Sequence, residues 1–134
     1  MKAWIIAAAI SAPCTAHADP CEGRLPKAVG EQFAGQVRYI VDGDGLCVGT
    51  TADPSTWIEV RLADFNAPEL RDTEGVRAKN LLAGLALNMP ATCTVTRGRS
   101  GRVLSFDRVF AICRIRGVAI GEAMRAAGAP QGGN

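Results

Sequence analysis

The chain has 134 residues, a formal net charge of +2 and a hydrophobic content of 48%. This length suits one domain with one core and excludes two, and the near-neutral charge excludes a highly basic protein. The charge is unevenly placed, because residues 97–125 hold seven arginines against two acids. Guanidinium groups bind phosphate in a bidentate way, so this half either contacts anions or forms an ordinary solvated basic face.

The first eighteen residues predict a secretory signal peptide. A basic Met1-Lys2 start precedes an apolar run over residues 3–12, and Ala16-His17-Ala18 is an A-x-A cleavage signal. The apolar run is too short to span a bilayer. We therefore expect cleavage after Ala18, a periplasmic or secreted location, and no membrane contact by the mature protein.

The mature chain divides into an irregular lead-in over 19–35, one domain over 36–129 and a disordered tail over 130–134. Within the domain, β-branched and aromatic alternation predicts strands over 37–41, 46–48, 57–62, 92–97 and 108–115. A helix is predicted from Asp72 or Thr73 to Met89, with Val76, Leu81, Leu82, Leu85 and Met89 on its apolar face. A short helix over 120–127 ends at Gly128. This order predicts a mainly β fold with helices (α+β): a five-stranded OB-type barrel with one helix inserted between strands and a short C-terminal helix.

Four cysteines remain in the mature chain, at positions 21, 47, 93 and 113. An even count in an exported protein predicts two disulfides, and three connectivities are open. The single histidine, His17, would be removed with the signal peptide. Serine–histidine and cysteine–histidine catalysis are thereby excluded, and a zinc site is disfavoured because no C-x-x-C pair exists.

Two polar segments follow neighbouring strands. Asp42-Gly43-Asp44-Gly45 forms a tight bend, with glycines at positions that tolerate positive φ, and the run from Arg61 to Glu69 begins about twenty residues later. Together they supply carboxylates, one amide and one arginine near two strand ends. That inventory suits a hard divalent cation with oxygen ligands, beside a group that holds phosphate.

Such residues have a plausible chemistry on a phosphodiester. Charge that develops on the non-bridging oxygens is stabilised by positioned cations, so Arg61 and Arg108 could clamp those oxygens beside a divalent ion. Glu69 is the candidate that orients or deprotonates the attacking water. Each residue also has a structural interpretation: Asp44 in a turn, Glu69 at a helix start, and Arg108 as a surface arginine beside Asp107.

The segment over 37–128 resembles the staphylococcal nuclease (thermonuclease-like) family. Three blocks carry the resemblance in the right order. Val41 to Gly45 is similar to the family's D-G-D followed by Thr or Ser. Arg61 to Glu69 is similar to R-L-x-x-x-D-x-P-E, and Phe106 to Ala111 forms the third block, followed by Gly117 and residues 122–128. D-G-D alone is a weak signal, whereas the three blocks together are specific.

The resemblance implies an OB-type barrel and hydrolysis of phosphodiester bonds in DNA or RNA by an endonuclease that depends on Ca²⁺ or another divalent cation. Carried over residue by residue, it assigns the catalytic positions to Arg61, Glu69 and Arg108. It assigns the metal ligands to Asp44, Asn66 and the backbone carbonyl of Ala67.

The chain departs from the family pattern at several positions. Asn66 replaces an aspartate, which removes one negative charge from the metal site. Gly45 replaces threonine or serine, and Asp107 replaces the glycine before Arg108. Phe106 replaces tyrosine; it keeps a ring that could stack on a substrate base but lacks the hydroxyl.

The resemblance also implies a disulfide pairing. Cys93 and Cys113 would lie on adjacent antiparallel strands and pair, which leaves Cys21 to pair with Cys47. We expect a monomer. Two other functions stay open: a catalytically weak barrel that binds nucleic acid, and an accessory exported protein with a vestigial site. Asn66 and Gly45 favour the binding module, whereas the intact Arg61, Glu69 and Arg108 favour the enzyme.

Overall fold

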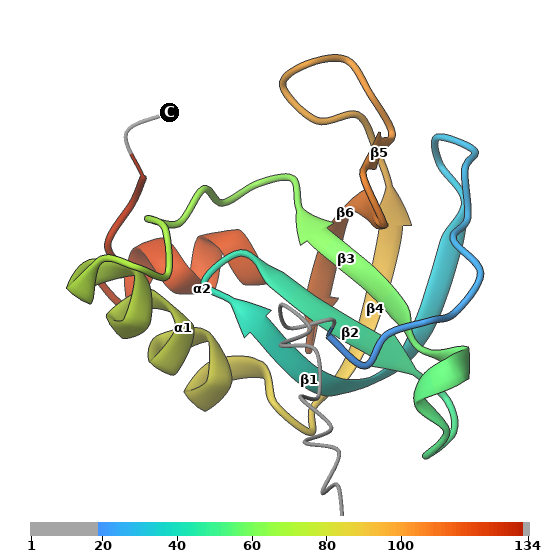
Figure 1. Cartoon of the computed structure of the whole chain (residues 1–134), viewed down its shortest axis with the longest axis horizontal. Coiled ribbons are helices and arrows are strands. Elements are labelled where there is room, and N and C mark those ends of the chain that lie inside the picture. The colour runs from blue at the N-terminus through green and yellow to red at the C-terminus, as the bar shows by residue number, and fades with distance from the viewer. Residues whose placement is uncertain (1–18, 133–134) are drawn as a thin grey trace, which may run out of the picture.

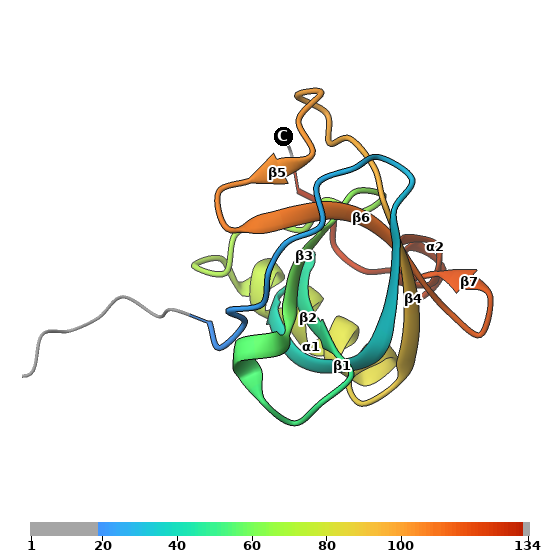
Figure 2. The same cartoon turned by 90° about the vertical axis from the view of Figure 1, so that its right-hand side faces the viewer.

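The computed structural model describes residues 19–132, and their strands close into a five-stranded mixed barrel. The barrel strands are β1 (Gln32–Asp42), β2 (Gly45–Gly49), β3 (Ile58–Leu62), β4 (Pro90–Val95) and β6 (Arg108–Ile115). Antiparallel β1–β2 and β2–β3 pairs lead to a parallel β3–β6 pair, and β4 joins β6 back to β1. Figure 2 shows this ring from one end. The predicted α+β class and five-stranded barrel are confirmed.

Shorter strands and the helices are attached to this barrel. The strands β5 (Leu104–Ser105) and β7 (Val118–Ala119) both pair with β6, and η1 (Pro54–Thr56) precedes β3. The helix α1 (Thr73–Ala86) lies between β3 and β4 in the chain, and α2 (Ile120–Ala126) follows β7. The two helices contact each other and lie at the same end of the barrel (Figure 1). Both helices match the sequence prediction in type and order.

One hydrophobic core fills the barrel and extends beneath the helices. Its fully buried members include Val37, Leu46 and Leu62 from three strands, Leu82 from α1 and Met124 from α2. Burial of each such side chain contributes about 1.5–3 kcal/mol. Both helices are therefore part of the same folding unit as the barrel.

The buried face of α1 agrees only in part with the prediction. Gly75, Ala78, Leu82 and Ala86 are the buried residues, whereas the predicted Val76 and Leu85 are exposed. The small residues let the helix backbone approach its neighbours closely. A Cβ at Gly75 would lie 1.9 Å from the carbonyl oxygen of Glu69. The sequence pattern placed Leu82 correctly, but it missed Gly75, Ala78 and Ala86, whose small size suits close packing of the helix.

Both ends of the described chain are more ordered than the irregular lead-in and the disordered tail that the sequence predicted. β1 begins at Gln32, inside the predicted lead-in, and its first residues pair with β4. At the other end Ala129 is buried, and the backbone N–H of Gly132 donates to the carbonyl oxygen of Asn66 at 2.8 Å. The first part of the predicted disordered tail therefore packs beside the Arg61–Glu69 segment. The predicted signal peptide and residues 133–134 lie outside the described residues.

Both predicted disulfides are confirmed. Cys21–Cys47 joins the lead-in to β2, and Cys93–Cys113 joins directly opposed positions of β4 and β6. A disulfide of this kind typically contributes about 2–4 kcal/mol to stability. Within residues 19–132, no helix is both long enough and apolar enough to cross a membrane.

Candidate phosphodiester-binding site

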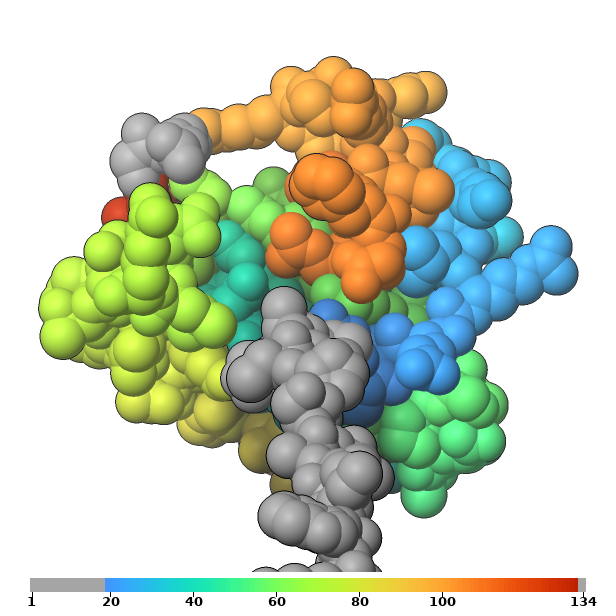
Figure 3. Space-filling view, in the orientation of Figure 1, coloured from blue at the N-terminus to red at the C-terminus, as the bar shows by residue number. Residues whose placement is uncertain are grey.

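A polar pocket of about 690 Å³ opens where three segments meet: the β1–β2 turn, the loop after β3 and the start of β6. Six of the seven predicted site residues line it: Asp44, Arg61, Asn66, Ala67, Glu69 and Arg108. Figure 3 shows the β1–β2 turn, in teal, in a hollow between the yellow-green segment that leads into α1 and the orange β5–β6 region. Residues separated by more than sixty positions in the sequence therefore share one cavity.

Asp44 is the most buried acid in this pocket. Its side chain accepts a hydrogen bond from the backbone N–H of Ala67 at 2.8 Å, and its Oδ2 lies 3.2 Å from Nη2 of Arg61. Burial, and then the neighbouring charge of Asp42, raise the pKa of Asp44 to about 7 despite the arginine. The pocket therefore holds a carboxylate whose negative charge is incompletely compensated by the protein.

The glycines of the Asp42–Gly45 turn provide space rather than an unusual backbone conformation. The glycines with positive φ in the described chain lie elsewhere, so the predicted reason for these two was wrong. A Cβ at Gly45 would lie 2.8 Å from Oδ1 of Asp42, the atom that accepts the backbone N–H of Asp44. A Cβ at Gly43 would lie 2.7 Å from that of Ala78 on α1. Small residues thus let the turn pack against α1.

Arg61 ties the loop after β3 to the β1–β2 turn. Its Nη2 donates to Oδ1 of Asn66 at 2.9 Å, and its Nη1 donates to the carbonyl oxygens of Phe65, at 2.8 Å, and Leu62. Its guanidinium carbon also lies 6.0 Å from the centre of the Phe110 ring. With Asp44 included, both terminal nitrogens already have partners. A ligand that takes an Nη2 hydrogen must compete with Asp44 or Asn66.

Arg108, at the start of β6, lies between two carboxylates. Its Nη1 is 3.8 Å from Oδ2 of Asp42, and its Nε is 3.9 Å from Oε2 of Glu59. Both separations exceed hydrogen-bond distance, so these acids orient the guanidinium by charge alone. Arg108 therefore retains hydrogen-bonding capacity for a ligand in the pocket.

Glu69 lies on the same pocket, at the end of the loop that leads into α1. Its carbonyl oxygen accepts the backbone N–H of Asp72 at 3.0 Å and abuts Gly75. The backbone of Glu69 is therefore held by the first turn of the helix. The small residue at position 75 makes this close contact possible and so positions the backbone from which the Glu69 side chain extends.

The donor set fits a hard divalent cation. Five carboxylates and two arginines line the pocket, which leaves an excess of negative charge. Oxygens of Asp44 and Asn66 both contact Nη2 of Arg61, so they lie close to each other, and oxygen ligands of this kind suit Ca²⁺. Ala67 fits less simply: a Cβ at Gly132 would lie 2.7 Å from its carbonyl oxygen, so the C-terminal segment packs against this predicted ligand.

Phe106 stands apart from the other predicted residues. It occupies the turn between β5 and β6 with a positive φ, is 98% exposed, and does not line the pocket. A second pocket, of about 520 Å³, lies nearer the arginines that the sequence singled out. Arg99 and Arg125 line it, and it shares Arg61, Asn66 and Gln131 with the first pocket. Because they share these residues, the two cavities adjoin each other.

Three residues near the site were missing from the predicted set. Asp42 lies in the D-G-D motif, so its sequence position could have indicated it. Glu59 lies two residues before Arg61, so the strand pattern puts both side chains on the same face of β3. This spacing indicates only weakly that Glu59 lies near the site. Gln131 comes from the predicted disordered tail, and nothing in the local sequence indicates its place at the pocket.

The raised pKa values of two acids predict that the free energy of unfolding of the metal-free protein depends on pH in an unusual way. Burial and then the Asp19 carboxyl raise the pKa of Glu59 to about 9, and that of Asp44 is about 7. Both exceed the unfolded values near 4, so their contribution to stability is complete below about pH 4 and is lost as the pH rises through about 7 and 9. We expect urea unfolding in chelator to show stability falling between pH 5 and 9 by several kcal/mol, at about 1.4 kcal/mol per unit of pKa difference.

Glu59→Gln isolates one part of this effect, because glutamine does not titrate. The variant should lose most of the fall above pH 7 while retaining the part that comes from Asp44. Parallel curves for wild type and variant over that range would show that Glu59 does not carry a raised pKa.

Comparison with known proteins finds a partial relative. No family model matches the chain. A protein named ParB from Escherichia coli is 41% identical over 54 residues, which cover 40% of this chain. The matched segment is 29% of the length of ParB, so this chain is similar to less than a third of that protein.

Proposed function

We propose that this protein is an exported, metal-dependent nuclease that hydrolyses phosphodiester bonds of DNA or RNA as an endonuclease. One observation carries the proposal: a single pocket brings together Asp44, Asn66, Arg61, Arg108 and Glu69 from three separate segments. The grouping supplies oxygen ligands, two permanent positive charges and a carboxylate base. Each of these groups can accelerate phosphodiester hydrolysis, the cation and arginines by stabilising charge and the carboxylate by accepting a proton.

Each residue has a role in this proposal. Asp44 and Asn66 would hold Ca²⁺ or another divalent cation, which supplies positive charge beside a phosphate oxygen. Arg108 donates to a non-bridging oxygen, and Arg61 does so when an Nη2 hydrogen leaves Asp44 or Asn66. Glu69 orients a water and accepts its proton as the water oxygen bonds to phosphorus and the opposite P–O bond breaks.

The disulfides support the exported location. All four cysteines of residues 19–132 are paired in two disulfides. Disulfides persist in oxidising compartments and are rare in the cytosol. This agrees with the signal peptide that the sequence predicts. The proposed place of action is therefore the periplasm or the medium.

A second candidate is a module that binds nucleic acid without cutting it. The occupied donors of Arg61 and the amide at Asn66 favour it, because both reduce what the pocket offers to a cation and to phosphate. The arginine-lined second pocket would then bind the backbone by charge.

One experiment separates these functions. Purified protein is incubated with supercoiled plasmid or with RNA, in Ca²⁺, Mg²⁺ or chelator, and Arg108→Ala protein purified in the same way controls for a contaminating nuclease. Cleavage that requires metal and is lost in the variant supports the nuclease. Retardation of the nucleic acid in a gel without cleavage supports the binding module. If neither cleavage nor retardation is observed, both functions are rejected.

Asn66→Asp should strengthen cation binding. The substitution restores a negative charge where Arg61 already contacts the side-chain oxygen, so the geometry is conserved. We expect the affinity for Ca²⁺ to rise on the order of tenfold, since ligand charge tunes such sites. Titration calorimetry on chelator-treated protein measures the change, with Asn80→Asp on the outer part of α1 as a control for net charge. Equal gains in both variants would reject the ligand role of Asn66.

A further inference from the structure

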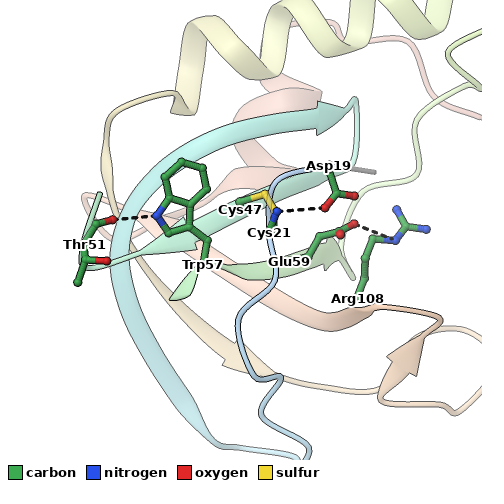
Figure 4. The surroundings of a disulfide bond; sticks show 7 residues. All are labelled: Asp19, Cys21, Cys47, Thr51, Trp57, Glu59 and Arg108. Carbon is green, nitrogen blue, oxygen red and sulfur yellow. Dashed lines mark hydrogen bonds and ion pairs between the residues drawn. A yellow bond between two sulfur atoms is a disulfide. The ribbon is translucent and has the colours of Figure 1, made fainter. Parts of the chain in front are cut away.

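Three carboxylates converge on the barrel outside the pocket described above. Oxygens of Asp19, Glu59 and Asp107 all lie within 4.8 Å of one another. They come from three segments: the lead-in, β3 and the β5–β6 turn. Figure 4 shows the Asp19 and Glu59 carboxyl groups side by side, with Arg108 next to Glu59. None of the three acids lines the Asp44 pocket.

Glu59 is the buried member of this cluster, and one of its carboxyl oxygens lacks a hydrogen-bond partner among the described residues. The residue is only 2% exposed, and its Oε1 has no hydrogen-bond partner among the described residues. The nearest described cation, Nε of Arg108, is 3.9 Å from Oε2, and Arg108 is shared with Asp42. Burying an ionised carboxylate with so little compensation costs several kcal/mol, so Glu59 needs either a proton or a bound cation as its partner.

The lead-in is held firmly enough to contribute a ligand. The Cys21–Cys47 disulfide fixes it to β2, and the backbone N–H of Cys21 donates to Oδ1 of Asp19 at 3.3 Å. The same disulfide removes both sulfurs as thiolate ligands, so only oxygen donors remain. When all three carboxylates are ionised, the guanidinium of Arg108 and the α-ammonium group that cleavage after Ala18 would leave on Asp19 do not fully balance them, so a net negative charge remains at this position.

We propose that Asp19, Glu59 and Asp107 form a second divalent-cation site, selective for hard cations such as Ca²⁺ or Mn²⁺. An all-oxygen, carboxylate-rich donor set is the one these ions prefer. The bound cation joins the lead-in to the barrel and restrains the turn that immediately precedes Arg108. The site is separate from the Asp44 pocket, and its occupancy does not depend on whether the protein cuts nucleic acid.

A proton shared between Asp19 and Glu59 is the competing occupant. Such a proton would relieve the repulsion between two carboxylates without any metal. If a proton occupies the cluster, substitution of Glu59 or Asp107 would not change the number of cations that the protein binds. A direct count of bound cations therefore distinguishes a shared proton from a bound cation.

Titration calorimetry of chelator-treated protein with Ca²⁺, and separately with Mn²⁺, tests the site. We expect wild type to bind two cations. Glu59→Gln and Asp107→Asn should each lose one, or bind it about tenfold or more weakly. Asp107 is exposed, so that variant should keep its fold, and circular dichroism checks this. Glu31→Gln, which removes an exposed carboxylate on the first turn before β1, is the control for net charge.

Asp44→Asn separates this site from the one in the pocket. That variant should still bind one cation, and Ca²⁺ should still raise its melting temperature in a concentration-dependent way. Loss of all cation binding in Asp44→Asn, or unchanged stoichiometry in both Glu59→Gln and Asp107→Asn, overturns the second site. Unchanged stoichiometry in Asp44→Asn with loss in the other two supports the second site while rejecting Asp44 as a ligand.

Discussion

Glu69→Gln should lower the rate of phosphodiester cleavage by about 10²–10⁴-fold, the range over which a positioned general base acts. Glutamine has nearly the same shape but does not accept a proton from water. The hydrogen bond described for Glu69 uses its backbone carbonyl, which the substitution leaves intact. The fold, the affinity for nucleic acid and the affinity for Ca²⁺ should therefore change little, so the loss should appear in kcat rather than in KM.

Glu74→Gln is the matched control, because Glu74 lines the same pocket and the change removes the same charge. Glu74 pairs with Arg77 in an exposed position on α1, where such a pair contributes little to stability. Its variant should cleave at nearly the wild-type rate. Initial rates on supercoiled plasmid, and gel retardation in Ca²⁺, provide the comparison. A similar loss in both variants would mean that the pocket's overall charge matters and that Glu69 is not the base.

The sequence was sufficient for the architecture because strand alternation and turn residues are local signals. The strand over 108–115 was predicted at its observed bounds. The disulfide pairing came from the family resemblance, because the cysteine positions alone left three connectivities open. The buried face of α1 was not predictable in the same way. It depends on how closely Gly75 and Ala78 approach the neighbouring loop and turn, and a pattern of large apolar residues carries no information about that distance.

The pocket was also predictable in its main residues but not in their interactions. Arg61 and Asp44 were placed at one site by motif spacing, whereas the direct contact between them was not foreseen. A sequence shows which residues are charged, but it does not show which of them form ion pairs with one another in the folded protein. The packing of Gly132 on the Asn66 loop was missed for another reason: a short Gly- and Pro-containing tail looks disordered until a tertiary contact holds it.

Arg61→Lys should damage both stability and catalysis. The guanidinium of Arg61 contacts Asp44, Asn66 and two carbonyl oxygens at once, and a single ammonium group does not span these positions. Buried acceptors would lose their donors, at about 1–3 kcal/mol in stability. If Arg61 also stabilises charge on phosphate, cleavage should fall by about 10²–10³-fold. Urea unfolding in chelator and plasmid cleavage measure the two effects separately.

Arg108→Lys is the informative partner, because the described contacts of Arg108 are two long ion pairs rather than hydrogen bonds. It should lose activity to a similar extent while its stability stays close to that of wild type. This contrast distinguishes an arginine that builds the site from one that mainly serves the ligand. If Arg61→Lys unfolds at the wild-type urea concentration, the network around Arg61 does not stabilise the loop. Its four contacts would then be exchangeable, and Arg61 would be as available to phosphate as Arg108.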